Sequence, residues 1–189
     1  MDRFIQTVQA LGNFSSSEID LLLKAVTVKQ FNKNDHLLKE GQVSSVIYFL
    51  NHGSLQQYHV NEDGAERTLN LFLQGDWVLD YQSFISRKPT QNFIVAYEDA
   101  EVVEMDIYSL HHLIAQSQVF FKMGRLLETG IQPGNLYTQF SSPEERYREV
   151  LSKKPLWFQK FPLHLIASYL GVAPETLSRI RKRISIPAA

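Results

Sequence analysis

Short hydrophobic runs separated by polar turns cover the middle of the chain. After about residue 27, the runs with high strand propensity are 46–50, 55–60, 68–73, 93–97 and 102–105. Turns rich in glycine, asparagine and aspartate separate these runs, and the Asp63-Gly64 pair is a strong hairpin signal. Many short strands at nearly regular spacing predict an antiparallel β jelly roll or barrel.

Helical signals lie on both sides of this region. Ser15 and Glu18 have the spacing of a capping box before the apolar run 19–26, which predicts an N-terminal helix. Ser142 stands before a proline and two glutamates, an order that caps a helix and places acidic residues in its first turn. We therefore expect a further helix from Pro143 to Lys153.

The connecting segment 107–140 carries apolar residues at helical spacing. They are Leu110, Leu113, Ile114, Phe120, Met123 and Leu127. Such a face packs either on a second copy of the chain or on the chain's own roll, and both alternatives stay open. The second alternative would bury Phe120, Phe121, Leu126 and Leu127. Gly130, Pro133 and Gly134 predict a break near residue 130, since proline inside a helix costs about 3 kcal/mol.

Two short amphipathic helices are predicted between Phe161 and Arg183. Pro162 suits the first turn of the first helix, whose apolar stripe is Leu163, Ile166, Ala167 and Leu170. Gly171 supplies the conformational freedom that a sharp turn needs, and Pro174 suits the first position of the second helix. The buried face of the second helix is expected to be Leu177, Ile180 and Ile184.

The other face of the second helix is polar and cationic. It carries Glu175, Thr176, Ser178, Arg179, Arg181, Lys182 and Arg183. Arg179 has the forked donors that match the O6 and N7 atoms of guanine, and Glu175 can accept from a cytosine amine. The two hydroxyl residues can reach base or phosphate oxygens, and the last three cations are expected to contact phosphates. The alternative is an ordinary helical hairpin with a solvated charged face.

The segment 166–180 resembles the helix-turn-helix of the Crp/Fnr family, the cyclic-AMP receptor and fumarate-nitrate regulators of bacteria. The family pattern A-x-x-L-G-x-x-x-E-T-x-S-R is matched by Ala167, Leu170, Gly171, Glu175, Thr176, Ser178 and Arg179. The earlier part of the chain is similar to the cyclic-nucleotide-binding roll of the same family. That similarity rests on Glu40-Gly41, Tyr48-Phe49-Leu50 and Gly53.

The resemblance implies an α+β protein with an N-terminal jelly roll, a connecting helix and a C-terminal helix-turn-helix. The expected ranges are 1–116 for the cyclic-nucleotide-binding-like sensor, 117–142 for the connecting and dimerisation region with its break near 130–134, and 143–189 for the DNA-binding domain. Few residues flank the hairpin, so little or no β wing is expected. The implied partners are double-stranded DNA, a second copy of the chain and RNA polymerase.

The resemblance weakens at the effector site. Relatives that hold cyclic AMP clasp its phosphate with a Gly-Glu pair opening a short helix and with an arginine followed by a small residue. This chain has Gly75-Asp76 and then Trp77, and Thr90-Gln91 replace the arginine. A buried phosphate without a fixed cation loses its charge-assisted contacts and keeps its desolvation cost. Asp76 and Asp80 would add repulsion.

We therefore expect the roll to hold an unknown small effector other than cyclic AMP, or none. The candidate effector-binding residues are Gly75, Asp76, Trp77, Arg87, Lys88, Thr90 and Gln91. Arg87 and Lys88 lie a few residues before the arginine position and are expected to be solvated turn residues.

Composition and charge agree with a two-domain regulator. The net charge of −1 is uneven, at −6 over residues 1–143 and +5 over 144–189, so the predicted DNA-binding part is the basic one. The chain has no cysteine, which excludes disulfides, iron-sulfur clusters and zinc-thiolate sites. No apolar run approaches the length of a membrane span, so a cytoplasmic protein is expected.

No motif predicts catalysis or a metal centre. The histidines, at positions 36, 52, 59, 111, 112 and 164, form no H-x-x-x-H pair, and no nucleophile elbow or phosphate-binding loop is present. The leading hypothesis is a homodimeric, sequence-specific transcription regulator. Its rivals are a ligand-binding or scaffold protein whose helical hairpin contacts proteins, and a cupin-like metal enzyme.

Overall fold

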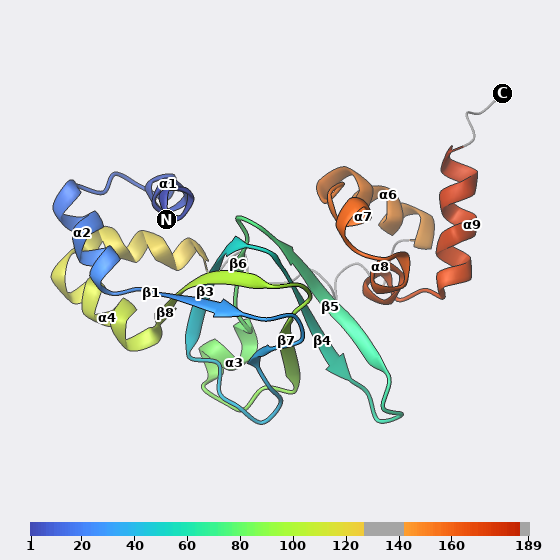
Figure 1. Cartoon of the computed structure of the whole chain (residues 1–189), viewed down its shortest axis with the longest axis horizontal. Coiled ribbons are helices and arrows are strands. Elements are labelled where there is room, and N and C mark those ends of the chain that lie inside the picture. The colour runs from blue at the N-terminus through green and yellow to red at the C-terminus, as the bar shows by residue number, and fades with distance from the viewer. Residues whose placement is uncertain (127–141, 186–189) are drawn as a thin grey trace. The chain divides into compact units, whose positions relative to one another are not determined.

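The computed structural model describes residues 1–126 and 142–185. Within these ranges the chain forms two compact units, which are coloured along the chain in Figure 1. One unit comprises residues 1–57 and 72–126, and the other comprises 58–71 and 142–185. Each unit is described by itself below.

The roll consists of two antiparallel sheets with four strands each. The strands are β1 (Thr27–Phe31), β2 (His36–Leu38), β3 (Val46–His52), β4 (Ser54–Val60), β5 (Glu66–Leu73), β6 (Trp77–Val78), β7 (Asn92–Ala96) and β8 (Ala100–Asp106). Their orders are β1-β8-β3-β6 and β2-β7-β4-β5. The predicted jelly roll and all five of its predicted strands are confirmed, whereas the short strands β1, β2 and β6 were not predicted.

Strand β3 is buried on both faces, which explains its unbroken apolar run. Tyr48 and Leu50 pack between the two sheets, while Ile47 and Phe49 pack in a second core beneath the helices. Successive side chains of a strand point to opposite faces, so one strand serves both cores. Its register with β8 places Phe49 opposite Val103.

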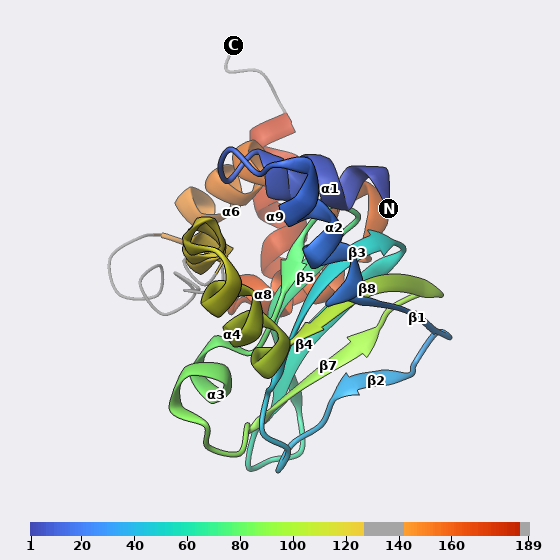
Figure 2. The same cartoon turned by 90° about the vertical axis from the view of Figure 1, so that its left-hand side faces the viewer.

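Helices cover the outer face of the sheet that contains β3, as Figure 2 shows. They are α1 (Asp2–Gln9), α2 (Ser16–Lys24), α4 (Ile107–Gln116) and the 3-10 helix η1 (Gln118–Gly124), while α3 (Tyr81–Ser86) follows β6. The predicted capping box of α2 is confirmed, because the Glu18 backbone N–H donates to Ser15 Oγ at 3.3 Å and the Ser15 N–H donates to Glu18 Oε2 at 2.7 Å. Hydrogen bonds from the Ser117 hydroxyl and from Ser15 hold the pKa of Glu18 below its ordinary value.

The helical segment that follows β8 is interrupted at Ser117, between α4 and η1. This residue has an extended backbone, and its hydroxyl donates to Glu18 Oε1 at 2.5 Å instead of lying within a helix. Beyond the interruption, Phe120 and Leu126 are buried in the core beneath the helices, as packing on the chain's own roll requires, whereas Phe121 is 65% exposed. The predicted break near 130 lies outside the described residues.

Four helices make up the C-terminal part of the second unit: α6 (Pro143–Lys153), α7 (Trp157–Lys160), α8 (Leu163–Leu170) and α9 (Pro174–Ser185). The predicted start of α6 is confirmed, because Ser142 caps it and Pro143 is its first residue. Their shared core includes Trp157, whose ring meets that of Tyr169 edge-on at 4.9 Å between centroids. The described residues from 142 to 185 contain no strand.

Candidate nucleic-acid interface and sensor site

The turn between α8 and α9 has the geometry that the sequence predicts. Gly171 adopts the left-handed conformation with φ of 66°, and the Val172 N–H donates to the Ala167 carbonyl at 3.0 Å. Pro174 is the first residue of α9, as expected. Pro162, however, lies one position before α8 with an extended backbone (ψ 151°), so its predicted place inside the first helical turn is wrong. The fixed φ of proline suits the capping position equally well.

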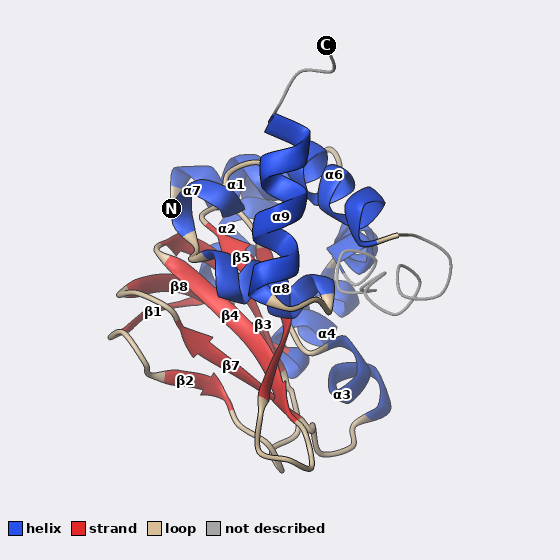
Figure 3. Ribbon diagram, turned by 90° about the vertical axis from the view of Figure 1, so that its right-hand side faces the viewer, coloured by secondary structure: helices blue, strands red, loops and turns tan. Residues whose placement is uncertain are grey.

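Helix α9 presents the two faces predicted for it. Leu177 and Ile180 are buried, and Ile184 is half-buried. The opposite side carries Glu175, Ser178, Arg179, Arg181, Lys182 and Arg183, all exposed, with Thr176 half-buried at the edge. Figure 3 shows α8 lying across the start of α9, with α6 beside it, so both helices hold α9 by its aliphatic side.

Helix α6 makes two charged contacts with the hairpin. Arg146 donates through Nη1 to the Leu170 carbonyl at 2.7 Å, which satisfies a backbone acceptor at the end of α8. Arg183, near the end of α9, forms an ion pair with Glu144 at 2.9 Å. Local sequence patterns predict neither contact, because each joins residues more than twenty positions apart.

The predicted effector segment forms a closed turn rather than an open pocket rim. Gly75 has φ of 97°, and the Leu73 N–H donates to Asp76 Oδ2 at 2.8 Å. The ring of Trp77 lies 5.1 Å from that of Phe49 and 5.8 Å from that of Phe4. Asp76 and Trp77 therefore stabilise the turn and the aromatic core, which also explains why the unpredicted helix α1 docks here through Phe4.

A buried carboxylate organises the neighbouring polar residues of the roll. Asp80 is 2% exposed and caps α3, since its Oδ1 accepts from the Ser83 N–H at 3.0 Å. Its Oδ2 accepts from Gln57 Nε2 at 3.1 Å, Thr90 Oγ1 at 3.0 Å and Asn92 Nδ2 at 2.7 Å. We call these residues the Asp80 network. They join β4, α3, β7 and the loop that precedes β7.

The remaining candidate effector residues do not converge on one point. Arg87 ends α3 in a left-handed conformation with φ of 58°, and its Nη1 donates to the Ser44 carbonyl at 2.9 Å. Arg87 is exposed at the end of α3, as expected of a turn residue, although its guanidinium also binds this carbonyl. Lys88 and Gln91 are exposed, while Thr90 is buried in the Asp80 network.

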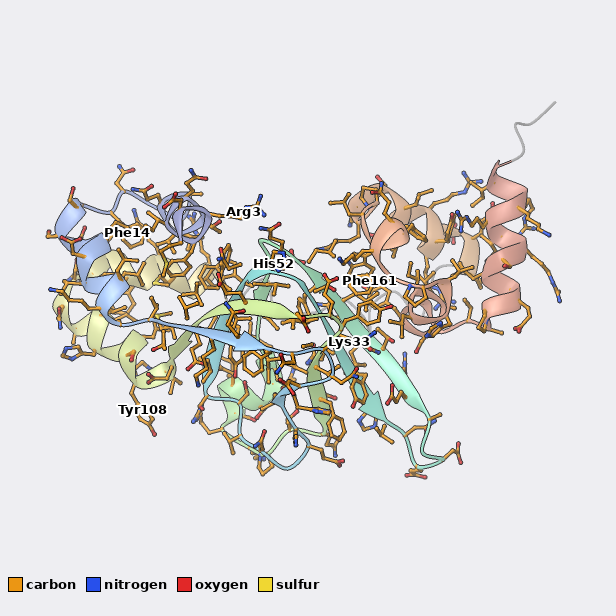
Figure 4. All side chains as sticks on the ribbon, viewed as in Figure 1. Arg3, Phe14, Lys33, His52, Tyr108 and Phe161 are labelled. Atoms are coloured by element: carbon orange, nitrogen blue, oxygen red, sulfur yellow. The ribbon has the colours of Figure 1, made fainter. Side chains whose placement is uncertain are left out.

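A groove of about 540 Å³ lies between α2 and α4, where Leu21, Ala25 and Leu113 supply apolar walls. Tyr108 stands at this groove, projects from α4 as Figure 4 shows, and is 74% exposed. The described ranges contain no cluster of three metal-binding side chains, and no helix there is long and apolar enough to span a bilayer.

Comparison with known proteins defines the class of the roll. Residues 28–117 match the family model of the cyclic nucleotide-binding domain. No curated protein matches the chain in sequence. The roll is therefore similar to a cyclic nucleotide-binding domain over these residues.

Solved structures extend the likeness over nearly the whole chain. The catabolite activator protein of Thermus thermophilus is 21% identical, with a TM-score of 0.58 over 93% of this chain and 85% of that chain. FixK2 of Bradyrhizobium japonicum is 17% identical, with a TM-score of 0.67 over 87% and 89%. The c-di-GMP responsive global regulator CLP of Xanthomonas campestris is 17% identical, with a TM-score of 0.62 over 90% and 91%. These likenesses establish a shared fold.

Proposed function

We propose that this chain is a sequence-specific DNA-binding transcription regulator of the Crp/Fnr type, without enzymatic activity. The observation that carries the proposal is α9, whose aliphatic side is buried while Glu175, Ser178 and Arg179 face outward. A B-DNA major groove about 12 Å wide admits one helix, and this face carries the donors and acceptors that read base edges there. The match to activators and regulators with the same fold adds to this argument.

The proposed partners are double-stranded DNA, a second copy of the chain and RNA polymerase. Arg179 would read a base, while Arg181, Lys182 and Arg183 would contact phosphates. A homodimer would place two recognition helices in successive major grooves about 34 Å apart, on a pseudo-palindromic site. Dimer formation would also strengthen DNA binding, because two linked modules engage one duplex together.

We further propose that the roll responds to a small effector other than cyclic AMP. The place at which the resemblance expects an arginine is taken by Thr90, which donates to Asp80, and Arg87 is bound to a backbone carbonyl. A cyclic phosphate brought to this buried carboxylate would meet a negative charge and no fixed cation. An effector acts only if it favours one conformation of the regulator over another.

A pair of substitutions tests the DNA-binding proposal. Arg179→Ala should weaken binding to a selected operator by about 1–3 kcal/mol and relax base preference, since it removes a bidentate base contact. Lys182→Ala should weaken all duplexes alike and reduce the salt dependence, since a phosphate contact carries no sequence information. Equal losses on every duplex for both variants would contradict the assigned roles. A wild-type protein that binds no duplex at low salt would favour the scaffold alternative.

The effector proposal is tested by titration of the wild-type protein. Trp77 lies in the aromatic core of the roll, three residues before Asp80 in the chain, so its emission should report ligand entry into the roll. Cyclic AMP should leave the emission unchanged, because the Kd expected for it lies above about 1 mM. Saturable binding of cyclic AMP in the micromolar range, seen also by calorimetry, would refute the proposal.

A further inference from the structure

One carboxylate in the C-terminal unit is shared by two arginines from different helices. Glu144 lies in the first turn of α6, and its Oε1 accepts from Arg148 Nη2 at 2.9 Å. Its Oε2 forms an ion pair with Arg183 Nη2, also at 2.9 Å. Arg148 lies one turn further along α6, whereas Arg183 lies near the end of α9. The two guanidiniums therefore hold the two oxygens of a single anion.

A DNA phosphate group offers the same pair of acceptors. It has two non-bridging oxygens and one negative charge, and guanidinium groups bind such oxygens through charge-assisted hydrogen bonds. The side chains of Arg148 and Arg183 are 60% and 68% exposed, compared with 30% for Glu144. Both arginines are thus open to a ligand from solvent, while the carboxylate between them is the more covered group.

We infer that Arg148 and Arg183 form a DNA phosphate site, which extends the interface from α9 onto α6, and that the Glu144 carboxylate occupies this site in the free protein. The inference rests on the proposed function, because the phosphate is that of the bound duplex. Binding replaces the carboxylate with a phosphate between the same guanidiniums. Glu144 therefore lowers the affinity for every duplex alike, since a phosphate contact carries no base information.

The expected size of the effect follows from the exposure of these pairs. Exposed ion pairs are weak, so Glu144→Gln should strengthen duplex binding by about two- to five-fold. Arg148→Gln should weaken binding by a similar factor, because it removes one phosphate contact. It should also reduce the slope of log affinity against log salt by about one.

A second pair on the same helix provides matched controls. Glu149 and Lys153 form an ion pair at 2.6 Å with the same i,i+4 spacing as Glu144 and Arg148. The variant Glu149→Gln therefore removes the same charge from α6 as Glu144→Gln does. Glu144 also pairs with Arg183 of α9, so its carboxylate lies between the two arginines of the proposed site. Glu149→Gln and Lys153→Gln should therefore change the affinity by less than half as much as the matching substitutions at Glu144 and Arg148.

The experiment measures fluorescence anisotropy of a labelled random-sequence duplex at about 50 and 200 mM salt. The full-length variants are first compared by circular dichroism melting, so that a folding defect is recognised. Glu144→Gln is also made together with Arg148→Gln and Arg183→Gln. In that background it should have no effect, because the carboxylate then has no guanidinium to occupy.

Several outcomes would overturn the inference. Equal gains from Glu144→Gln and Glu149→Gln would show only a general effect of charge. An unchanged affinity for Arg148→Gln would remove α6 from the interface. A gain from Glu144→Gln that persists without both arginines would show that the carboxylate acts elsewhere. If the folded wild-type protein binds no duplex at the lower salt concentration, the proposed function itself fails, and this site fails with it.

Discussion

Replacing Asp80 with alanine would show how much of the roll's stability depends on one buried carboxylate. This side chain is 2% exposed and accepts hydrogen bonds from a backbone N–H and from the side chains of Gln57, Thr90 and Asn92. The substitution leaves these three donors around a cavity without an acceptor. It also removes the cap of α3.

The structure sets the expected magnitude. A buried donor without an acceptor costs about 1–3 kcal/mol, and the loss of a helix cap costs about 1 kcal/mol. The three donors can relax or admit water, so the separate costs do not add in full. Removing the charged member of such a network is expected to lower the free energy of unfolding by about 3–5 kcal/mol. Asp80→Asn should cost less, because it keeps the volume and one acceptor.

Asp106 provides a control for a partly exposed cap that has one side-chain donor, the Ser109 hydroxyl. It caps α4 by accepting from the backbone N–H groups of Tyr108 and Ser109, and it is only partly buried. Asp106→Ala should therefore cost about 1–2 kcal/mol. The difference between the two alanine variants measures what full burial and the three side-chain donors of Asp80 add to a partly exposed cap with one such donor.

The assay exploits the two tryptophans of the chain, Trp77 in the roll and Trp157 in the helical unit. In a Trp157→Phe background, urea unfolding followed by tryptophan emission reports the roll alone. A loss below about 1.5 kcal/mol for Asp80→Ala, or one equal to that of Asp106→Ala, would refute the importance of the network. If Asp80→Ala does not fold, Asp80→Asn and the single-donor variant Gln57→Leu rank the same contributions.

Four other substitutions test contacts elsewhere in the two units. Arg146→Met should destabilise the helical unit by about 1.5–3 kcal/mol in urea unfolding, because its charged hydrogen bond to the last carbonyl of α8 is partly buried. Gly53→Ala should abolish or strongly reduce folding yield, since a Cβ there would collide with backbone atoms, whereas Gly64→Ala has open space and should cost only about 1–2 kcal/mol for its positive φ. Ser109→Ala should raise the pKa of Asp106 towards its ordinary value of 3.8 in an NMR titration, because the Ser109 hydroxyl is the main cause of its lowering. The lowered pKa of Asp106 contributes stability above pH 4 that is lost as the pH falls through it, so the variant should lose less stability on acidification.

Local signals predicted the parts of the fold that local interactions determine. The capping residues Ser15 and Ser142 each lie three positions from the glutamate that completes their box, and both boxes form. Gly171 makes the turn between α8 and α9 because it alone there adopts a positive φ at little cost. The faces of α9 follow from helical periodicity, and so the outward set could be predicted before its surroundings were known.

The elements that sequence reasoning missed depend on distant partners. Helix α1 lacks a side-chain cap, and it is held by Phe4 and Val8, which insert into a core built by later strands. Strand β1 alternates too weakly to be recognised, since its residues are mostly exposed and its partner β8 lies some seventy positions later. Ser117 breaks the helical pattern because its hydroxyl bonds to Glu18, a contact that no local window contains.

The charged positions show the same limit most clearly. Asp80 suggested repulsion of a phosphate when it was considered beside Asp76, yet three neutral donors from two other segments surround it. Conversely, Arg183 suggested a freely available phosphate contact, yet Glu144 already engages it. In both cases the residue type was identified correctly, but its availability depends on a partner brought in by the fold. The type of a charged residue therefore predicts which ligands it can attract. Whether it is available to such a ligand depends on the partners that the fold places beside it, because it must first release them.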